Sequence, residues 1–234
     1  MRYTEKAPPL VMLHGFTSSS FTWKPFISEY KKHFKLIIPD MRGHGQSTNP
    51  TNKFTHRQSA HDIYALLDHL EVDRFKAMGW SSGGMTLIHM ATQQPERIKS
   101  MVLMAATPHF PKECRELQAH ALDKEWDEGW APQNHLHKDG EKQMRLLRQQ
   151  FYDFKDSYDD MNFTPPYLST IKAKTLIVHG DRDGFFPVDI PVTMYTSIPN
   201  SYLWIMPNMG HDLVQASEYF IQTISDFLSG KWET

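Results

Sequence analysis

Short apolar runs separated by longer amphipathic segments dominate the pattern of hydrophobic and polar positions along the chain. The runs fall at residues 10–13, 36–38, 75–78, 101–104, 176–178 and 202–205. Each is too short for a stable helix and rich in β-forming residues, which predicts a buried strand. Helical spacing of apolar residues falls over about 22–33, 56–71, 83–94 and 216–229. Strands that alternate with helices predict an α/β fold whose mostly parallel sheet of about six strands is covered on both faces.

The alternation breaks between about residues 108 and 168. This stretch has helical periodicity, several charges and no convincing strand, and the strand–helix rhythm resumes after it. It is also rich in aromatic residues, namely Phe110, Trp126, Trp130, Phe151, Tyr152, Phe154, Tyr158, Phe163 and Tyr167. We interpret it as a small helical cap inserted into a single domain that spans residues 1–234. Its aromatic side chains either line an apolar pocket or pack the cap onto the sheet, and both readings stay open.

Composition and charge exclude several classes of protein. A hydrophobic share of 40% is ordinary for a globular chain, which excludes a disordered or collagen-like protein. Lysine and arginine number 25 against 27 acidic residues, and no basic block stands out, so no nucleic-acid partner is expected. No apolar run approaches the roughly 20 residues of a membrane span. The single cysteine, Cys114, excludes an internal disulfide, and the start of the chain shows no secretory signal. A cytoplasmic location is expected.

A candidate nucleophile lies in the segment Gly79-Trp80-Ser81-Ser82-Gly83, which matches the pattern G-x-S-x-G. The segment joins the predicted strand near 75–80 to the predicted helix 83–94. That context suits a serine held on a sharp strand-to-helix turn, where the backbone approaches its neighbours so closely that glycine is needed at both ends. We therefore expect Ser81 to be the nucleophile.

A serine hydroxyl needs a general base, and the chain contains 13 histidines. His211 follows the last predicted strand in a loop at the same edge of the sheet as Ser81, and it is the expected base. His179 ends its own strand and is expected to pack there. Because His211 must be neutral to act, activity should fall as this histidine becomes protonated at acid pH.

The orienting acid is expected directly after the penultimate strand, where two carboxylates compete. Asp183 lies farther into the loop and can reach the loop that carries His211, whereas Asp181 is close to the strand end and can pair with Arg182. We choose Asp183. The resulting order, Ser81 then Asp183 then His211, is the order nucleophile, acid, base of the α/β-hydrolase triad.

An oxyanion hole requires two backbone N–H groups. Ser82 follows the nucleophile and supplies one, and the loop after the first strand is expected to supply the other from Phe16. Trp80 and Phe16 are the expected pocket residues beside the nucleophile. No metal or cofactor is expected, since the pair His135 and His137 has no third ligand and is read as two surface residues.

These segments together resemble the α/β-hydrolase superfamily, in particular its branch of single-domain serine esterases, lipases and cofactor-free haloperoxidases. The matching motifs are His14-Gly15-Phe16, residues 40–47, Gly79-Trp80-Ser81-Ser82-Gly83-Gly84, His179-Gly180-Asp181-Arg182-Asp183 and Gly210-His211. The resemblance implies that Arg42 and His44 belong to a structural turn. It also implies a departure, because relatives usually begin with a hairpin of two strands, which we expect to be absent here since only about nine residues precede Leu10. The strand at 35–39 would then be a sheet edge, and we expect either that the loss of the hairpin is tolerated or that a homodimer forms along this edge.

The expected reaction is hydrolysis of small to medium, mainly apolar carboxylic esters through an acyl-enzyme on Ser81. Carbon–carbon bond hydrolases, lactonases and perhydrolases share the same triad and stay open as alternatives. A serine nucleophile disfavours haloalkane dehalogenases and epoxide hydrolases, whose relatives carry aspartate at that position. A ligand receptor built on the same fold is the alternative of another class, and the complete set of triad residues argues against it.

Overall fold

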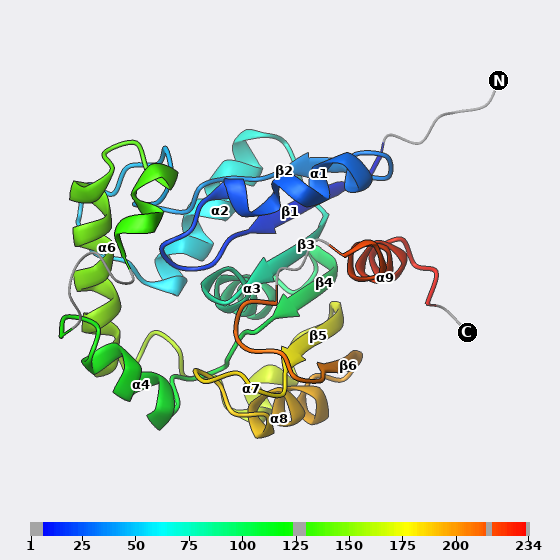
Figure 1. The fold of residues 1–234 in the computed structure, drawn as a ribbon. Coiled ribbons are helices and arrows are strands. Elements are labelled where there is room, and N and C mark those ends of the chain that lie inside the picture. Colours follow the sequence, from blue (N-terminus) through cyan, green and yellow to red (C-terminus); the bar gives the residue numbers. More distant parts are fainter. Residues whose placement is uncertain (1–6, 124–129, 214–216, 233–234) are drawn as a thin grey trace.

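The structure is a computed structural model that describes residues 7–123, 130–213 and 217–232. In these ranges six strands form one sheet, in the spatial order β2-β1-β3-β4-β5-β6, and every neighbouring pair is parallel (Figure 1). The strands are β1 (Pro9–Leu13), β2 (Lys35–Ile37), β3 (Phe75–Trp80), β4 (Ile98–Met104), β5 (Lys174–Gly180) and β6 (Ser201–Met206). The predicted α/β class and the sheet of about six parallel strands are confirmed.

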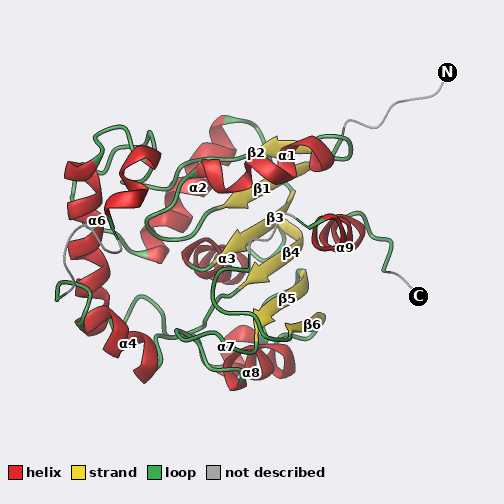
Figure 2. Ribbon diagram, viewed as in Figure 1, coloured by secondary structure: helices red, strands yellow, loops and turns green. Residues whose placement is uncertain are grey.

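Helices cover both faces of this sheet (Figures 1 and 2). The helices outside the cap stretch are α1 (Lys24–Tyr30), α2 (His56–His69), α3 (Ser82–Gln93), α8 (Asp189–Ser197) and α9 (Glu218–Leu228). Thr55 caps α2 and Ser217 caps α9, each through a side-chain oxygen that accepts a backbone N–H of the first turn. The predicted helix 22–33 is shorter than expected. A 3-10 turn, Ser20–Trp23, precedes α1, and Pro25 stands in the first turn of α1, where its missing N–H costs nothing.

The core consists of two apolar layers, one on each face of the sheet, because successive residues of a strand point to opposite faces. Leu10 and Met12 of β1 pack with Trp23, Phe26 and the apolar side of α9. The alternate residues of the same strand, such as Val11, pack with α2, α3 and α8. Both layers are nearly free of exposed side chains, so the strands are rigidly held and their ends are fixed in space.

Strand β2 forms one edge of the sheet, as the family resemblance implied. It pairs with β1 over three residues, from Lys35 opposite Pro9 to Ile37 opposite Val11. All strands run in one direction, so their carboxyl ends lie along the same side of the sheet. That side carries the loops after β1, β3, β5 and β6.

The stretch predicted as a cap contains helices in the ranges that the structure describes. They are α4 (Lys112–Ala119), α6 (Glu141–Asp153), α7 (Pro165–Leu168) and the 3-10 turns Ala131–Leu136 and Phe154–Asp156. The isolated bridge between His109 and Asn162 joins the two ends of the stretch. We call residues 108–168 the cap segment. Among the described helices, none is long and apolar enough to cross a membrane.

Candidate active site

Ser81 lies on the tight turn between β3 and α3, and its backbone φ of 52° is in the left-handed region that side chains rarely adopt. The glycines on either side leave no room for a side chain. A Cβ at Gly83 would lie 2.1 Å from the carbonyl oxygen of Leu13, and one at Gly79 would lie 2.5 Å from the backbone of Gly83. The strained backbone at Ser81 is therefore imposed by close packing of this turn against β1.

A continuous line of hydrogen bonds connects the three residues expected to form the triad. The Ser81 hydroxyl lies 2.9 Å from Nε2 of His211. Nδ1 of His211 lies 2.8 Å from Oδ2 of Asp183. A carboxylate only accepts hydrogen bonds, so Nδ1 carries the imidazole proton and Nε2 is free to accept the proton of Ser81. This arrangement suits a serine nucleophile with a general base and an orienting acid.

Asp183 is oriented by the loop that follows β5. Its Oδ1 accepts the backbone N–H groups of Phe185 at 2.8 Å and Phe186 at 3.1 Å, which leaves Oδ2 for His211. Burial alone would raise the pKa of this carboxyl, but the hydrogen bond and charge interaction with His211 outweigh it and lower the pKa. Asp183 therefore carries its negative charge at neutral pH.

The competing carboxylate, Asp181, contacts other groups than His211. Its Oδ1 accepts the backbone N–H of Met209 at 3.3 Å, and its Oδ2 lies 3.9 Å from Nε of Arg182. His179 is fully buried, and its Nε2 donates to the carbonyl of Phe186 at 2.8 Å. Both residues thus occupy the local positions that the sequence indicated for them.

Further contacts hold His211 in place, one at its backbone carbonyl and two at its imidazole. The indole N–H of Trp80 donates to the carbonyl of His211 at 3.1 Å. The rings of Phe185 and Phe186 lie 4.6 and 5.2 Å from the imidazole, measured between centroids. These contacts fix the direction in which Nε2 points.

Two backbone N–H groups beside the nucleophile have no hydrogen-bond acceptor in the described part of the chain. Ser82 is the first residue of α3, so its N–H has no acceptor within the helix. The N–H of Phe16, in the loop after β1, has no protein acceptor in the described part of the chain. Phe16 and Ser82 line the same cavity as Ser81.

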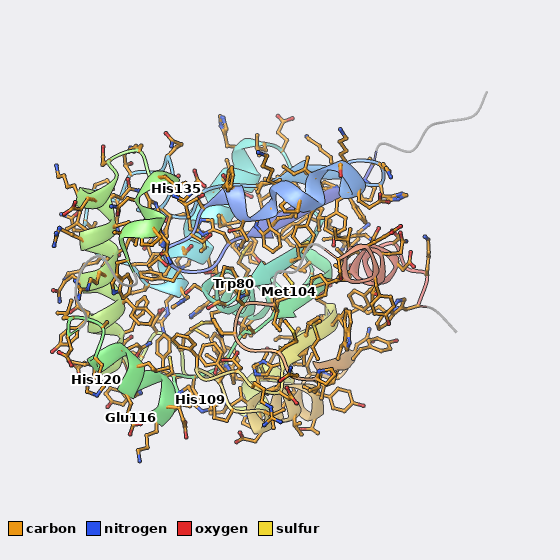
Figure 3. The ribbon with its side chains drawn as sticks, viewed as in Figure 1. Trp80, Met104, His109, Glu116, His120 and His135 are labelled. Carbon is orange, nitrogen blue, oxygen red and sulfur yellow. The ribbon has the colours of Figure 1, made fainter. Side chains whose placement is uncertain are left out.

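A cavity of about 330 Å³ opens onto Ser81 and His211, and both Trp80 and Phe16 line it. Figure 3 shows Trp80 near the centre of the molecule, beside Met104 at the end of the neighbouring strand. The cap segment contributes its own aromatic side chains to the cavity wall, namely Phe110, Trp130, Phe151 and Phe154. The cavity is therefore mostly apolar. Its polar lining comes both from the surroundings of Ser81 and from the cap segment, which contributes Gln118, His120 and Gln133.

Other aromatic residues of the cap segment do not line the cavity. The two interpretations of the cap aromatics, pocket lining and packing, therefore each hold for some of these residues. Tyr158 is 65% exposed, and its ring lies beneath the guanidinium of Arg115. Phe163 packs against His89 and Tyr167. Trp126 lies outside the described residues.

The reading of His135 and His137 as two surface residues is wrong for His137. His135 is exposed (Figure 3), but His137 is buried. Nδ1 of His137 accepts the N–H of Gly45 at 2.9 Å, so Nε2 carries the proton and donates to the carbonyl of Thr17 at 3.0 Å. The histidine joins the cap segment to the loop after β1. Its burial follows from contacts between distant segments, which sequence spacing does not reveal.

Sequence reasoning also missed a pair of buried residues beside the nucleophile. His56 of α2 lies 3.0 Å from the Ser82 hydroxyl and 2.7 Å from the carboxylate of Asp160. The two residues are 104 positions apart, and neither belongs to a motif, so no signal in the chain pointed to them. Nowhere in the described ranges are three histidine, cysteine, aspartate or glutamate side chains grouped so that they could hold a metal ion.

Comparisons with known proteins identify relatives of this chain. The sequence profile of the family described as alpha/beta hydrolase fold matches residues 8–149. The mouse protein serine hydrolase BPHL is 27% identical over 238 residues, which cover 97% of this chain and 81% of that protein. Two solved structures match with a TM-score of 0.75 and cover 97% of this chain. One is a meta-cleavage product hydrolase from Pseudomonas fluorescens, 20% identical, of which 92% is covered. The other is the carboxylesterase CesB from Bacillus subtilis, 21% identical, of which 85% is covered.

Proposed function

Since the chain belongs to the α/β-hydrolase family, we propose that this hydrolase cleaves carboxylic esters through an acyl-enzyme on Ser81. The observation that carries the proposal is the line of hydrogen bonds from Ser81 through His211 to Asp183. Ser81 and His211 line a mostly apolar cavity in which a substrate can bind. The cofactor-free chemistry of such a triad needs only these side chains and an oxyanion hole.

In the acylation half of the reaction, Ser81 Oγ attacks the ester carbonyl carbon while Nε2 of His211 takes the hydroxyl proton. The carbonyl oxygen becomes an oxyanion that accepts hydrogen bonds from the backbone N–H groups of Phe16 and Ser82. Asp183 keeps the imidazole in the required tautomer and stabilises the imidazolium. The tetrahedral intermediate collapses, and the leaving alkoxide receives the proton from His211.

In the deacylation half, water attacks the acyl-enzyme and gives a proton to His211. The second tetrahedral intermediate expels Ser81 Oγ, which takes that proton back. The products are the carboxylic acid and the alcohol, and the enzyme returns to its starting state.

The cavity supports the substrate class. A volume of about 330 Å³ walled by aromatic rings suits a small or medium acyl chain or an aryl group. Phe16 packs against four aromatic rings of this region, so its own ring is fixed as part of the wall. We propose Trp80 and Phe16 as residues that contact the bound ester.

Hydrolysis of p-nitrophenyl acetate and p-nitrophenyl butyrate tests the proposal. We expect wild type to hydrolyse both, with the longer chain preferred, and Ser81→Ala to lose nearly all of the rate. Equal rates for wild type and Ser81→Ala would refute ester hydrolysis through Ser81. A fluorophosphonate probe should label wild type and leave Ser81→Ala unlabelled.

Carbon–carbon bond hydrolysis is the second candidate, and the similarity to a meta-cleavage product hydrolase favours it. A panel of vinylogous diketones, lactones and simple esters separates this activity from lactonase and esterase activity. If kcat/KM for a diketone is far above kcat/KM for every ester, the protein is a carbon–carbon bond hydrolase and the esterase proposal is refuted. A receptor without turnover would instead bind ligands in this cavity and show no rate that depends on Ser81.

A further inference from the structure

A second line of serine, histidine and aspartate lies directly beside the first. His56 is the first residue of α2 and is fully buried. Its Nε2 lies 3.0 Å from Oγ of Ser82, and its Nδ1 lies 2.7 Å from Oδ2 of Asp160. The spacing repeats that of Ser81, His211 and Asp183, but the serine is the neighbour of the nucleophile.

The hydrogen bonds around Asp160 fix where the protons are. The carboxylate accepts the backbone N–H groups of His56 at 2.7 Å and Arg57 at 3.0 Å, so it occupies the positive end of α2. Burial alone would raise the pKa of Asp160, but hydrogen bonds from His56 and His89 outweigh it and hold the pKa far below its usual range. An ionised carboxylate only accepts, so Nδ1 of His56 donates to Asp160. In the neutral imidazole, Nε2 then accepts a hydrogen bond from the Ser82 hydroxyl.

His89 completes the network from helix α3. Its Nε2 donates to the backbone carbonyl of Asp160 at 2.7 Å and lies 3.5 Å from the carboxylate. Asp160 is therefore held by α2 and α3 at once, although it comes from the cap segment.

The hydrogen bonds of Ser82, His56 and Asp160 help to restrain the strained turn at Ser81. A backbone φ of 52° at a serine persists only where the surroundings restrain it. On one side, glycine packing against β1 supplies the restraint. On the other side, Ser82 is tied by its hydroxyl to a buried imidazole that cannot move without breaking the carboxylate contacts. The backbone N–H of Ser82 is the group that the proposed mechanism directs at the oxyanion.

We propose that His56 and Asp160 are positioning residues that hold the backbone N–H of Ser82 toward the developing oxyanion. The cap segment and the oxyanion hole are thereby coupled through one carboxylate. This inference rests on the proposed serine-hydrolase function, because it concerns the same reaction.

The test compares Ser82→Ala with wild type. The variant keeps the backbone N–H and removes only its anchor. We expect kcat for p-nitrophenyl butyrate to fall about tenfold to a hundredfold while KM changes less than about twofold, since a misplaced oxyanion donor affects the transition state alone. Affinity for butylboronic acid, which forms a tetrahedral adduct on Ser81, should fall by the same factor as kcat. Affinity for butyrate should not change.

Ser59→Ala is the matched control. Ser59 lies on α2, the helix of His56, and is buried, and its hydroxyl has no partner in the described structure. We expect it to leave kcat, KM and boronate affinity unchanged. His56→Leu is the second variant, which removes the same anchor from the other side and should reproduce the losses of Ser82→Ala.

Retention of kcat and boronate affinity in folded Ser82→Ala or folded His56→Leu would overturn the inference, even with a lowered Tm. That result would mean that the network serves stability alone. Failure of the proposed function gives a different pattern, in which wild type itself neither hydrolyses esters nor binds the boronate, and the inference falls with it.

Discussion

Replacing Asp183 with asparagine should switch the tautomer of His211, and the structure indicates the direction of the change. Oδ1 of Asp183 accepts two backbone N–H groups, from Phe185 and Phe186. The asparagine amide must keep its oxygen at that position, because an NH₂ group there would meet two donors. Its NH₂ group then points at Nδ1 of His211, which must become an acceptor. Nε2 consequently carries the proton and cannot take one from Ser81.

The magnitude follows from the loss of the general base. A change from carboxylate to amide at this place in a serine triad lowers the turnover number by about four orders of magnitude. That corresponds to about 5 kcal/mol of transition-state stabilisation at 1.36 kcal/mol for each factor of ten. The fold should survive, because the amide oxygen still accepts the N–H groups of Phe185 and Phe186.

Asp181→Asn is the matched control for this experiment. Its carboxylate makes one long hydrogen bond to the N–H of Met209 and an exposed contact with Arg182, and neither reaches His211. Exposed ion pairs contribute about 0–1 kcal/mol, so kcat/KM should stay within about twofold of wild type. Steady-state hydrolysis of p-nitrophenyl butyrate at pH 8 measures all three proteins. An equal or larger loss in Asp181→Asn, or a loss below tenfold in Asp183→Asn, would refute the assignment of the acid.

Three further predictions concern stability and assembly. Gly83→Ala should destabilise the fold by about 3 kcal/mol or more in urea unfolding, because its Cβ would lie 2.1 Å from the Leu13 carbonyl oxygen. Gly184→Ala, whose Cβ meets no atom within 4 Å, should change the free energy of unfolding by less than about 1 kcal/mol, and equal losses would contradict this reasoning. Burial lowers the pKa of His14 to about 4 in the folded protein, whereas a histidine in the unfolded chain has a pKa of about 6.5. Between these two pH values the unfolded chain binds a proton that the folded protein does not. Stability should therefore be full above pH 6.5 and fall by about 3 kcal/mol as pH decreases toward 4, and an unfolding free energy that is flat over this range would oppose the assignment. Dimerisation through the edge strand Lys35–Ile37 predicts a species of two 27.3 kDa chains in size-exclusion chromatography, and a strict monomer would count against it.

The strand and helix pattern was predictable because it depends on local periodicity. A parallel sheet covered by helices buries both faces of each inner strand, so all side chains of such a strand are apolar. The continuous apolar run at residues 10–13 therefore predicts a strand. The boundaries of α1 were less predictable. Residues near 31–33 continue the helical spacing, but the chain leaves the helix after Tyr30 and enters β2 at Lys35. Helix ends depend on where the next strand must start, which no local pattern records.

Some residues of the candidate site were likewise predictable from the sequence, and others were not. Ser81 carries a signal because strained geometry requires glycines at fixed spacing, and His211 and Asp183 carry one because strand ends bring their loops to one side of the sheet. Asp160 has no such signal, since its neighbours come from α2 and α3 and its own place in the cap segment depends on how that segment packs. Burial of this carboxylate is costly by itself, but two backbone N–H groups and two imidazoles outweigh that cost and hold its pKa far below the usual range. The same network reaches Ser82 through His56, so we expect it to support the strained turn at Ser81 and Ser82 as well as to hold the cap segment.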